Sequence, residues 1–265
     1  PEVNRLVRNA YWGMLSNYVS IPTDCPQRNE RLGWTADTWV FADTALYFAD
    51  VASFLGKWMT DMRDAQSADG AFPIIAPLVA APPPQGGKPI NGWSDAGVIV
   101  PYLVWRQTGS REIVDRNWEA MERYMDCLRA NKGPNNMFGD WVHLETTEYA
   151  RFFWLYDAQI MQRLARTTGR ADAVAKYAAD EAAARRAKGM ITTYYVCCGP
   201  RYPNTFAAST LPEAYWLGAY PAFAGLDGFL RWAWNSWPRN PKEDATFGGW
   251  RAGDTFLCYP GGEPS

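Results

Sequence analysis

Apolar positions recur every three to four residues over most of the first 188 residues, which predicts amphipathic helices. The first helix covers residues 1–16 and places Leu6, Ala10 and Met14 on one face. Six further helices are predicted over residues 37–47, 50–66, 95–108, 110–131, 147–168 and 171–188. Their connections alternate between short and long, so these six helices form three successive hairpins. Stacked helical hairpins build a solenoid or a closed toroid, and long connections gathered on one side of a toroid would form a site. The candidate N-caps of three of these helices are Thr35 or Asp37, Ser94 or Asp95, and Ser110.

The pattern changes near Gly189. Residues 190–198 are rich in β-branched and aromatic side chains and predict a buried strand. Residues 228–234 and 254–260 predict two more strands, and residues 211–223 predict a helix between the first two strands. Strand–helix–strand order is typical of a parallel α/β unit. We therefore expect a helical domain over residues 1–188 and a short α/β, barrel-like segment over residues 189–265.

Composition excludes several classes of partner. The net charge of −2 over 265 residues offers no basic surface for nucleic acid, and no apolar run is long enough to suggest a membrane span. The five cysteines are irregularly spaced and include no C-x-x-C pair, which argues against a disulfide framework and a zinc site. No metal or other cofactor is predicted, and the sequence gives no compartment.

Two residue counts bear on the chemistry. The chain has 14 Trp and a single His, His143. Sugars present apolar C–H faces that stack on aromatic rings, so a Trp-rich acidic chain suits carbohydrate binding, although tryptophans also fill helical cores. One histidine argues against a Ser-His-Asp triad and against multi-histidine metal sites. Carboxylates are therefore the candidate catalytic groups.

The densest polar segment is SIPTDCPQRNERLGWTAD at residues 20–37, where Asp24, Glu30 and Asp37 lie near the start of a predicted helix. Glycoside hydrolysis needs one carboxylic acid to protonate the leaving oxygen and a second carboxylate across the sugar ring. A carboxyl beside an aromatic ring and another carboxylate can stay protonated near neutral pH. The alternative is a solvated loop of Asp–Arg pairs.

The segment resembles the catalytic motif of glycoside hydrolase family 78, the inverting α-L-rhamnosidases. The resemblance extends over residues 1–188 and includes NAYW at 9–12, NYVSIPTDCPQR at 17–28, GWSDA at 92–96 and FGDW at 138–141. It implies a mainly α fold, here a partial (α/α)6 toroid of helical hairpins. It also implies a carbohydrate partner, a glycoside that carries terminal α-L-rhamnose.

The resemblance implies roles for individual residues. Glu30 takes the position of the general acid. The residues that would hold or line the sugar are Asp24, Arg28, Trp34, Asp37, Trp93, Asp95 and Trp141. Asn29 departs from the aspartate usual in the family, which removes one carboxylate. The family's general base is a glutamate from a later hairpin, and no matching segment follows Lys188.

The last part of the chain resembles another enzyme. Residues 194–201, 211–218, 227–235 and 253–260 are similar to the final strands of the barrel in glycoside hydrolase family 123, the β-N-acetylgalactosaminidase type. Glu213, Trp232, Trp234 and Asn235 could line a sugar site there. The chain would then be a fragment or a composite of two glycosidases. Three functions stay open: an inverting α-L-rhamnosidase, a sugar-binding remnant without turnover, and an N-acetylhexosaminidase-like enzyme.

Overall fold

The computed structural model describes residues 2–78, 88–136, 138, 146–195, 217, 219, 221 and 226–230. The chain divides into two compact units, Pro1–Lys188 and Gly189–Ser265. Within the described residues, none of the helices combines the length and the apolar character that crossing a bilayer requires.

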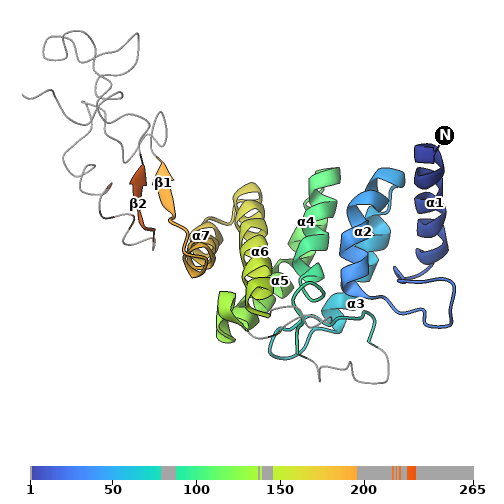
Figure 1. Cartoon of the computed structure of the whole chain (residues 1–265), viewed down its shortest axis with the longest axis horizontal. Helices are drawn as coiled ribbons and strands as arrows, with labels where there is room; N and C mark the ends of the chain where they lie inside the picture. Colours follow the sequence, from blue (N-terminus) through green and yellow to red (C-terminus); the bar gives the residue numbers. More distant parts are fainter. Residues whose placement is uncertain are drawn as a thin grey trace, which may run out of the picture. The chain divides into compact units, whose positions relative to one another are not determined.

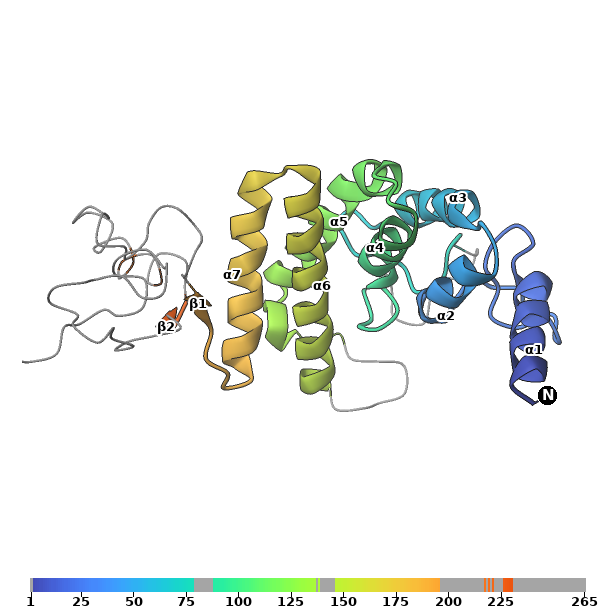
Figure 2. The same cartoon turned by 90° about the horizontal axis from the view of Figure 1, so that it is seen from above.

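The first unit is built of helices (Figures 1 and 2). They are α1 (Glu2–Asn17), α2 (Thr35–Phe48), α3 (Ala52–Asp64), α4 (Ala96–Thr108), α5 (Glu112–Ala130), α6 (Thr146–Thr168) and α7 (Ala171–Ala187), with a short 3-10 helix η1 (Gly133–Asn135). Each of the seven helices predicted over residues 1–188 is present, with every end within two residues of the prediction. The helix predicted over residues 211–223 lies mostly outside the described residues. A short connection joins α2 to α3, α4 to α5 and α6 to α7, as the three predicted hairpins require. Helix α4 packs against α5 and α6 against α7, whereas α2 and α3 pack mainly against α4.

Helix α4 lies at the centre of this unit. It packs against α2, α3, α5 and α6, and every residue from Ala96 to Val104 is buried. Helix α5 shows the ordinary amphipathic pattern instead, with Trp118, Met121, Tyr124 and Met125 facing the core. The fold therefore has one buried helix with more exposed helices around it.

Two of the predicted caps are not made by side chains. The N-cap of α2 is Trp34 and that of α4 is Asp95, and neither side chain bonds to the first turn of its helix. Thr35 Oγ1 donates to Ile74 O at 3.1 Å. The Asp95 carboxylate accepts a hydrogen bond from the Tyr124 hydroxyl of α5 at 2.9 Å. Tertiary partners have thus replaced the local capping that the sequence suggested.

The connection between α3 and α4 runs back across the start of α2. Thr35 N bonds to Ile74 O, and Ala76 N bonds to Gly33 O, both at 3.0 Å. Gly33 is required here, because a Cβ at this position would lie 2.2 Å from Ala76 O. The polar motif and this connection are therefore joined by backbone hydrogen bonds.

In the second unit, strands β1 (Thr193–Tyr195) and β2 (Gly228–Leu230) pair in parallel, with Tyr194 opposite Phe229. Both lie inside predicted strand segments, and their direction agrees with the strand–helix–strand order. The predicted strand at 254–260 lies outside the described residues. A barrel-like identity for this unit stays a prediction.

Candidate functional site

The polar motif folds as a loop that closes on itself between α1 and α2. Asp24 N bonds to Leu32 O at 3.3 Å, and Thr23 Oγ1 donates to Asn17 Oδ1 at 3.0 Å. Arg31 has a positive φ of 55°, which is uncommon for a residue with a Cβ and turns the chain back toward α2. This closure brings the side chains of residues 24–30 beside the first turn of α2.

Glu30 lies at the centre of this loop with its side chain 20% exposed. Its Oε1 accepts a 2.7 Å hydrogen bond from Trp34 Nε1. Its Oε2 forms an ion pair with the Arg28 guanidinium and lies 3.8 Å from Cys25 Sγ. Arg28 Nε also donates to Cys25 Sγ at 3.3 Å. The structure thus brings Glu30, Arg28 and Trp34 together, as the sequence grouped them.

Asp24 belongs to the same cluster. One Asp24 oxygen, Cys25 Sγ and one Glu30 oxygen lie within 4.8 Å of one another. Such a set offers a cation only two carboxylates and a thiol, whereas Ca²⁺ takes six to eight oxygen ligands. Arg28 already balances part of this negative charge. The cluster therefore suits polar contacts to hydroxyl groups better than ion binding.

Asp37 and Asp24 line one cavity between α1 and α2, of about 330 Å³. The pKa of Asp37 is raised, first by partial burial and then by the nearby Asp24 and Glu30 carboxylates. Tyr18 lines the same cavity, and its hydroxyl and Asp24 Oδ1 are buried without a hydrogen-bond partner in the described part of the chain. Buried polar groups of this kind usually have a partner, so both are candidate contacts for sugar hydroxyls.

Sequence reasoning missed Tyr18, although it lies within the motif at residues 17–28. An aromatic residue with a hydroxyl group, six residues before Asp24 in a polar segment, could have indicated a sugar contact. Its ring stacks on Phe54 of α3 with centroids 4.7 Å apart, which explains why a core role was the simpler interpretation.

Trp34 and Trp93 share one apolar cluster. Both pack, with Leu32, against the buried side chains of Ile74, Ile75 and Ile90. Both rings are half-buried, so each keeps some surface open to a ligand. The connection between α3 and α4 therefore links the motif to the turn at residues 91–95.

The remaining two predicted residues are placed differently. Asp95 is 0% exposed and its carboxylate accepts hydrogen bonds from Tyr124 and from Gly92 N. It is enclosed by protein and has no open surface for a sugar. Trp141 lies outside the described residues.

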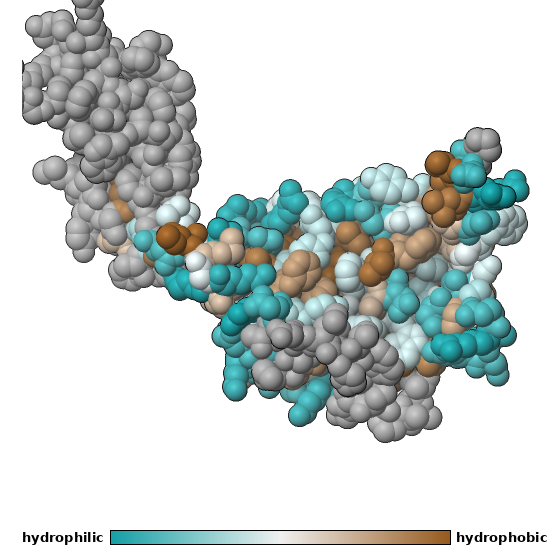
Figure 3. Space-filling view, viewed as in Figure 1, coloured by the Kyte–Doolittle hydropathy of each residue, from teal (hydrophilic) through white to brown (hydrophobic). Residues whose placement is uncertain are grey.

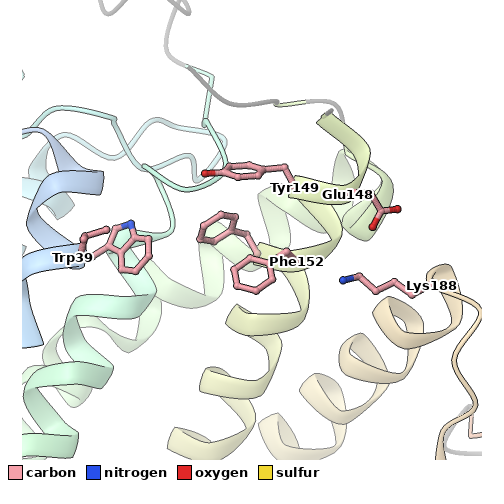
Figure 4. Close-up of a pocket in the computed structure, with 7 residues that line it drawn as sticks. Trp39, Glu148, Tyr149, Phe152 and Lys188 are labelled. Carbon is pink, nitrogen blue, oxygen red and sulfur yellow. The ribbon is translucent and has the colours of Figure 1, made fainter. Parts of the chain in front are cut away.

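A second hollow, of about 630 Å³, lies between α2 and α6. Figure 4 shows Trp39 on one side and Glu148 and Lys188 on the other, with Tyr149 and Phe152 between them. Trp39 Nε1 donates to Gly92 O at 2.5 Å, so this aromatic wall touches the same turn that carries Trp93. Sequence reasoning gave no role to Trp39 or Tyr149, because nothing local separates them from core aromatics.

The family model for the bacterial α-L-rhamnosidase six-hairpin glycosidase domain matches residues 1–212. The chain belongs to this family. Among individual relatives, an α-L-rhamnosidase of Streptomyces avermitilis is 37% identical over 178 residues, or 64% of this chain and 17% of that protein. An α-L-rhamnosidase of Formosa agariphila is 36% identical over 145 residues, or 53% of this chain and 15% of that protein. The chain thus spans less than a fifth of the length of these relatives.

Solved structures of α-L-rhamnosidases also match this chain. The crystal structure of the Streptomyces avermitilis α-L-rhamnosidase complexed with L-rhamnose matches 70% of this chain and 19% of that one, at 34% identity and a TM-score of 0.63. Native α-L-rhamnosidase from Aspergillus terreus matches 72% of this chain and 24% of that one, at 26% identity and a TM-score of 0.65. The predicted partial toroid of helical hairpins is confirmed. The family match continues to residue 212, beyond the resemblance predicted to end at residue 188.

Proposed function

We propose that this chain carries the sugar-binding and acid side of an α-L-rhamnosidase site, with Glu30 as the general acid. The observation that carries the proposal is the setting of Glu30. Trp34 holds one carboxyl oxygen of Glu30 and Arg28 holds the other, in a loop beside two further carboxylates and in a chain of the rhamnosidase family.

The chemistry follows from these contacts. Glu30 would donate its proton to the glycosidic oxygen as the bond to the anomeric carbon breaks. The proton leaves a carboxylate on Glu30, and the N–H groups of Trp34 and Arg28 would stabilise that charge as it forms. Donors already in place need no reorganisation at this step.

Sugar binding would use the cavity beside Glu30. Asp24 and Asp37 offer acceptors to sugar hydroxyls, and Tyr18 offers one hydroxyl. Trp34 and Trp93 offer half-buried rings on which the apolar face of a rhamnose could stack. Trp141 is proposed as a further sugar contact from the family motif alone.

The general base is unassigned, so binding and turnover need separate tests. Inversion requires a water molecule activated by a second carboxylate about 6.5–9.5 Å from the acid. A chain that supplies the acid and the sugar contacts without that base would bind L-rhamnose without hydrolysing a rhamnoside. The N-acetylhexosaminidase-like alternative rests on residues outside the described part of the chain, and nothing observed favours it.

The test combines calorimetric titration with L-rhamnose and hydrolysis of methyl α-L-rhamnopyranoside, whose alkoxide leaving group needs a proton from the acid. The variants are Glu30→Gln, Asp24→Asn and, as a control, Glu112→Gln, which alters an exposed carboxylate paired with Arg116. We expect Asp24→Asn to weaken L-rhamnose binding about tenfold, the effect of one lost hydrogen bond to a charged group. Glu30→Gln should reduce turnover about 100-fold or more.

Each outcome has a clear meaning. Binding without turnover by the unmodified chain would support the sugar site and assign catalysis to a base elsewhere. Turnover that Glu30→Gln leaves unchanged would remove Glu30 from the acid role. A folded chain that neither binds L-rhamnose nor hydrolyses the rhamnoside would refute the proposal.

A further inference from the structure

Two buried carboxyl groups meet in the core beneath the turn at residues 91–95. Asp95 ends this turn and Asp157 lies on α6, and both are 0% exposed. They are close enough for the charge of Asp95 to act on the Asp157 carboxyl group. Two ionised carboxylates side by side in the core would repel one another, so such a pair favours one neutral and one ionised member.

The other contacts of the pair decide where the proton lies. Asp95 accepts from Gly92 N at 2.5 Å and from the Tyr124 hydroxyl at 2.9 Å. Neither oxygen of Asp157 meets a donor in the described part of the chain. A buried anion without a donor would be very costly, whereas a protonated carboxyl in the same place can donate to Asp95.

The titration behaviour agrees with this geometry. Burial raises the pKa of both aspartates, and the charge of Asp95 raises that of Asp157 further. The other titratable groups that act here are Tyr124, whose own pKa is raised by burial and by both aspartates, and Cys127 of α5, which acts on Tyr124. On α6, Tyr156 is influenced by Asp157.

The ionised Asp95 is tied to the turn that carries Trp93. Asp95 holds Gly92 N, while Trp39 holds Gly92 O from the opposite side. Asn91 donates to Asn136 Oδ1 at 3.0 Å, and Ser94 donates to Phe72 O at 2.8 Å. The turn is thus held by α2, by the connection between α3 and α4, and by the residue that follows η1. Trp93 follows Gly92 directly.

We propose that Asp157 is protonated at neutral pH, donates to the ionised Asp95, and through Asp95 positions the turn that presents Trp93 to the sugar. Asp95 is then a positioning residue and does not contact the substrate. The part of this inference that concerns sugar rests on the proposed function, whereas the location of the proton and the support of the turn do not.

The first test measures unfolding by urea between pH 5 and pH 9. The unfolded chain releases the Asp157 proton that the folded chain retains, so the unfolding constant should rise by up to tenfold per pH unit. Asp157→Asn keeps a donor toward Asp95 at every pH and should remove that dependence. The control is Asp180→Asn, because Asp180 is a buried carboxylate paired with Arg129 instead of with another carboxyl. It should lower stability and keep the pH dependence.

The second test measures hydrogen exchange of the turn and L-rhamnose affinity at pH 7. Asp157→Val removes the donor without changing Asp95, and should speed exchange of the Gly92 amide and weaken L-rhamnose binding, each about tenfold. Asp157→Asn should leave both within about twofold of the unmodified chain, which a purely volume-filling role of Asp157 would not explain.

The outcomes separate the two proposals. If no form of the chain binds L-rhamnose, the proposed function fails, while unfolding and exchange still decide the position of the proton. Equal pH dependence in the unmodified chain and Asp157→Asn would overturn the inference. If Asp157→Asn does not fold, infrared spectroscopy of the unmodified chain above pH 7 decides it: a protonated-carboxyl band supports the inference, and its absence overturns it.

Discussion

Trp34 donates a hydrogen bond of 2.7 Å to Glu30 and also packs in the apolar cluster that contains Trp93. One residue therefore joins the proposed acid to the proposed stacking surface. Its ring and its N–H group serve different purposes, and a substitution can separate them.

Trp34→Phe keeps an aromatic ring against Ile75 and removes the donor to Glu30. Because the site is partly open to water, we expect the free energy of unfolding to fall by about 1–2 kcal/mol. Urea denaturation measures this, with Trp12→Phe as the control, since Trp12 is 60% exposed on α1. An equal effect of both substitutions would show that the Trp34 hydrogen bond contributes nothing.

Gly33→Ala should disrupt the support of the motif. The added methyl would lie 2.2 Å from Ala76 O and 3.3 Å from Trp58 Nε1, so the backbone of one segment must move. We expect a loss of about 1–3 kcal/mol in thermal or urea unfolding, the range for overpacking.

Gly56→Ala is the matched control for that change. Gly56 lies inside α3, where a new methyl meets nothing within 4 Å. Alanine favours the helix over glycine by about 1 kcal/mol, so this variant should be stabilised. Stabilisation by both substitutions would contradict the close approach at Gly33.

Glu30→Gln should lower the pKa of Asp37. Burial and the charges of Asp24 and Glu30 raise the pKa of Asp37 in the folded chain, and the substitution removes one of those charges. Carbon-13 NMR titration of the Asp37 carboxyl measures the shift, with Glu112→Gln as the control. An unchanged titration of Asp37 in Glu30→Gln would place the two groups farther apart in solution.

The raised pKa of Asp37 also determines how stability changes with pH. A carboxyl with a raised pKa in the folded state holds protons that the unfolded chain has released, so its contribution to stability falls as the pH rises above the ordinary value of 3.8. Asp37→Asn should therefore weaken the loss of stability with rising pH.

Arg129→Met tests the ion pair between α5 and α7. Arg129 holds Asp180 through Nε at 3.2 Å and Nη2 at 2.5 Å, and Asp180 is 8% exposed. Removing the partner of a buried carboxylate should cost about 2–3 kcal/mol of unfolding free energy, allowing for the partial exposure of Arg129. Arg116→Met, which breaks an exposed pair with Glu112, should cost less than about 1 kcal/mol.

The sequence predicted the helices well because their apolar positions recur with helical spacing and several end at a glycine, such as Gly109 and Gly169. It grouped Glu30, Arg28 and Trp34 correctly because those residues are close along the chain. Contacts within one short loop join residues that are close in the sequence, so the sequence alone can predict them.

Contacts between residues far apart in the sequence could not be predicted in this way. Asp95 follows a Trp and a Ser in a polar turn, as an exposed sugar contact would, yet Tyr124 and Asp157 enclose it from two distant helices. The bond from Trp39 to Gly92 spans 53 residues. Burial of this kind depends on how the hairpins pack, which local periodicity does not encode.

Helix α4 has a consequence for how the first unit folds. Its buried segment includes Val98, Ile99 and Val100, which favour helix weakly, and Pro101, which donates no backbone hydrogen bond. Such a peptide would not be helical in water by itself, because isolated helices of this length are marginal even with better sequences. Its structure therefore depends on α2, α3, α5 and α6 being present at the same time. Unlike a linear array that can lose one repeat after another, the three hairpins should melt in a single cooperative transition.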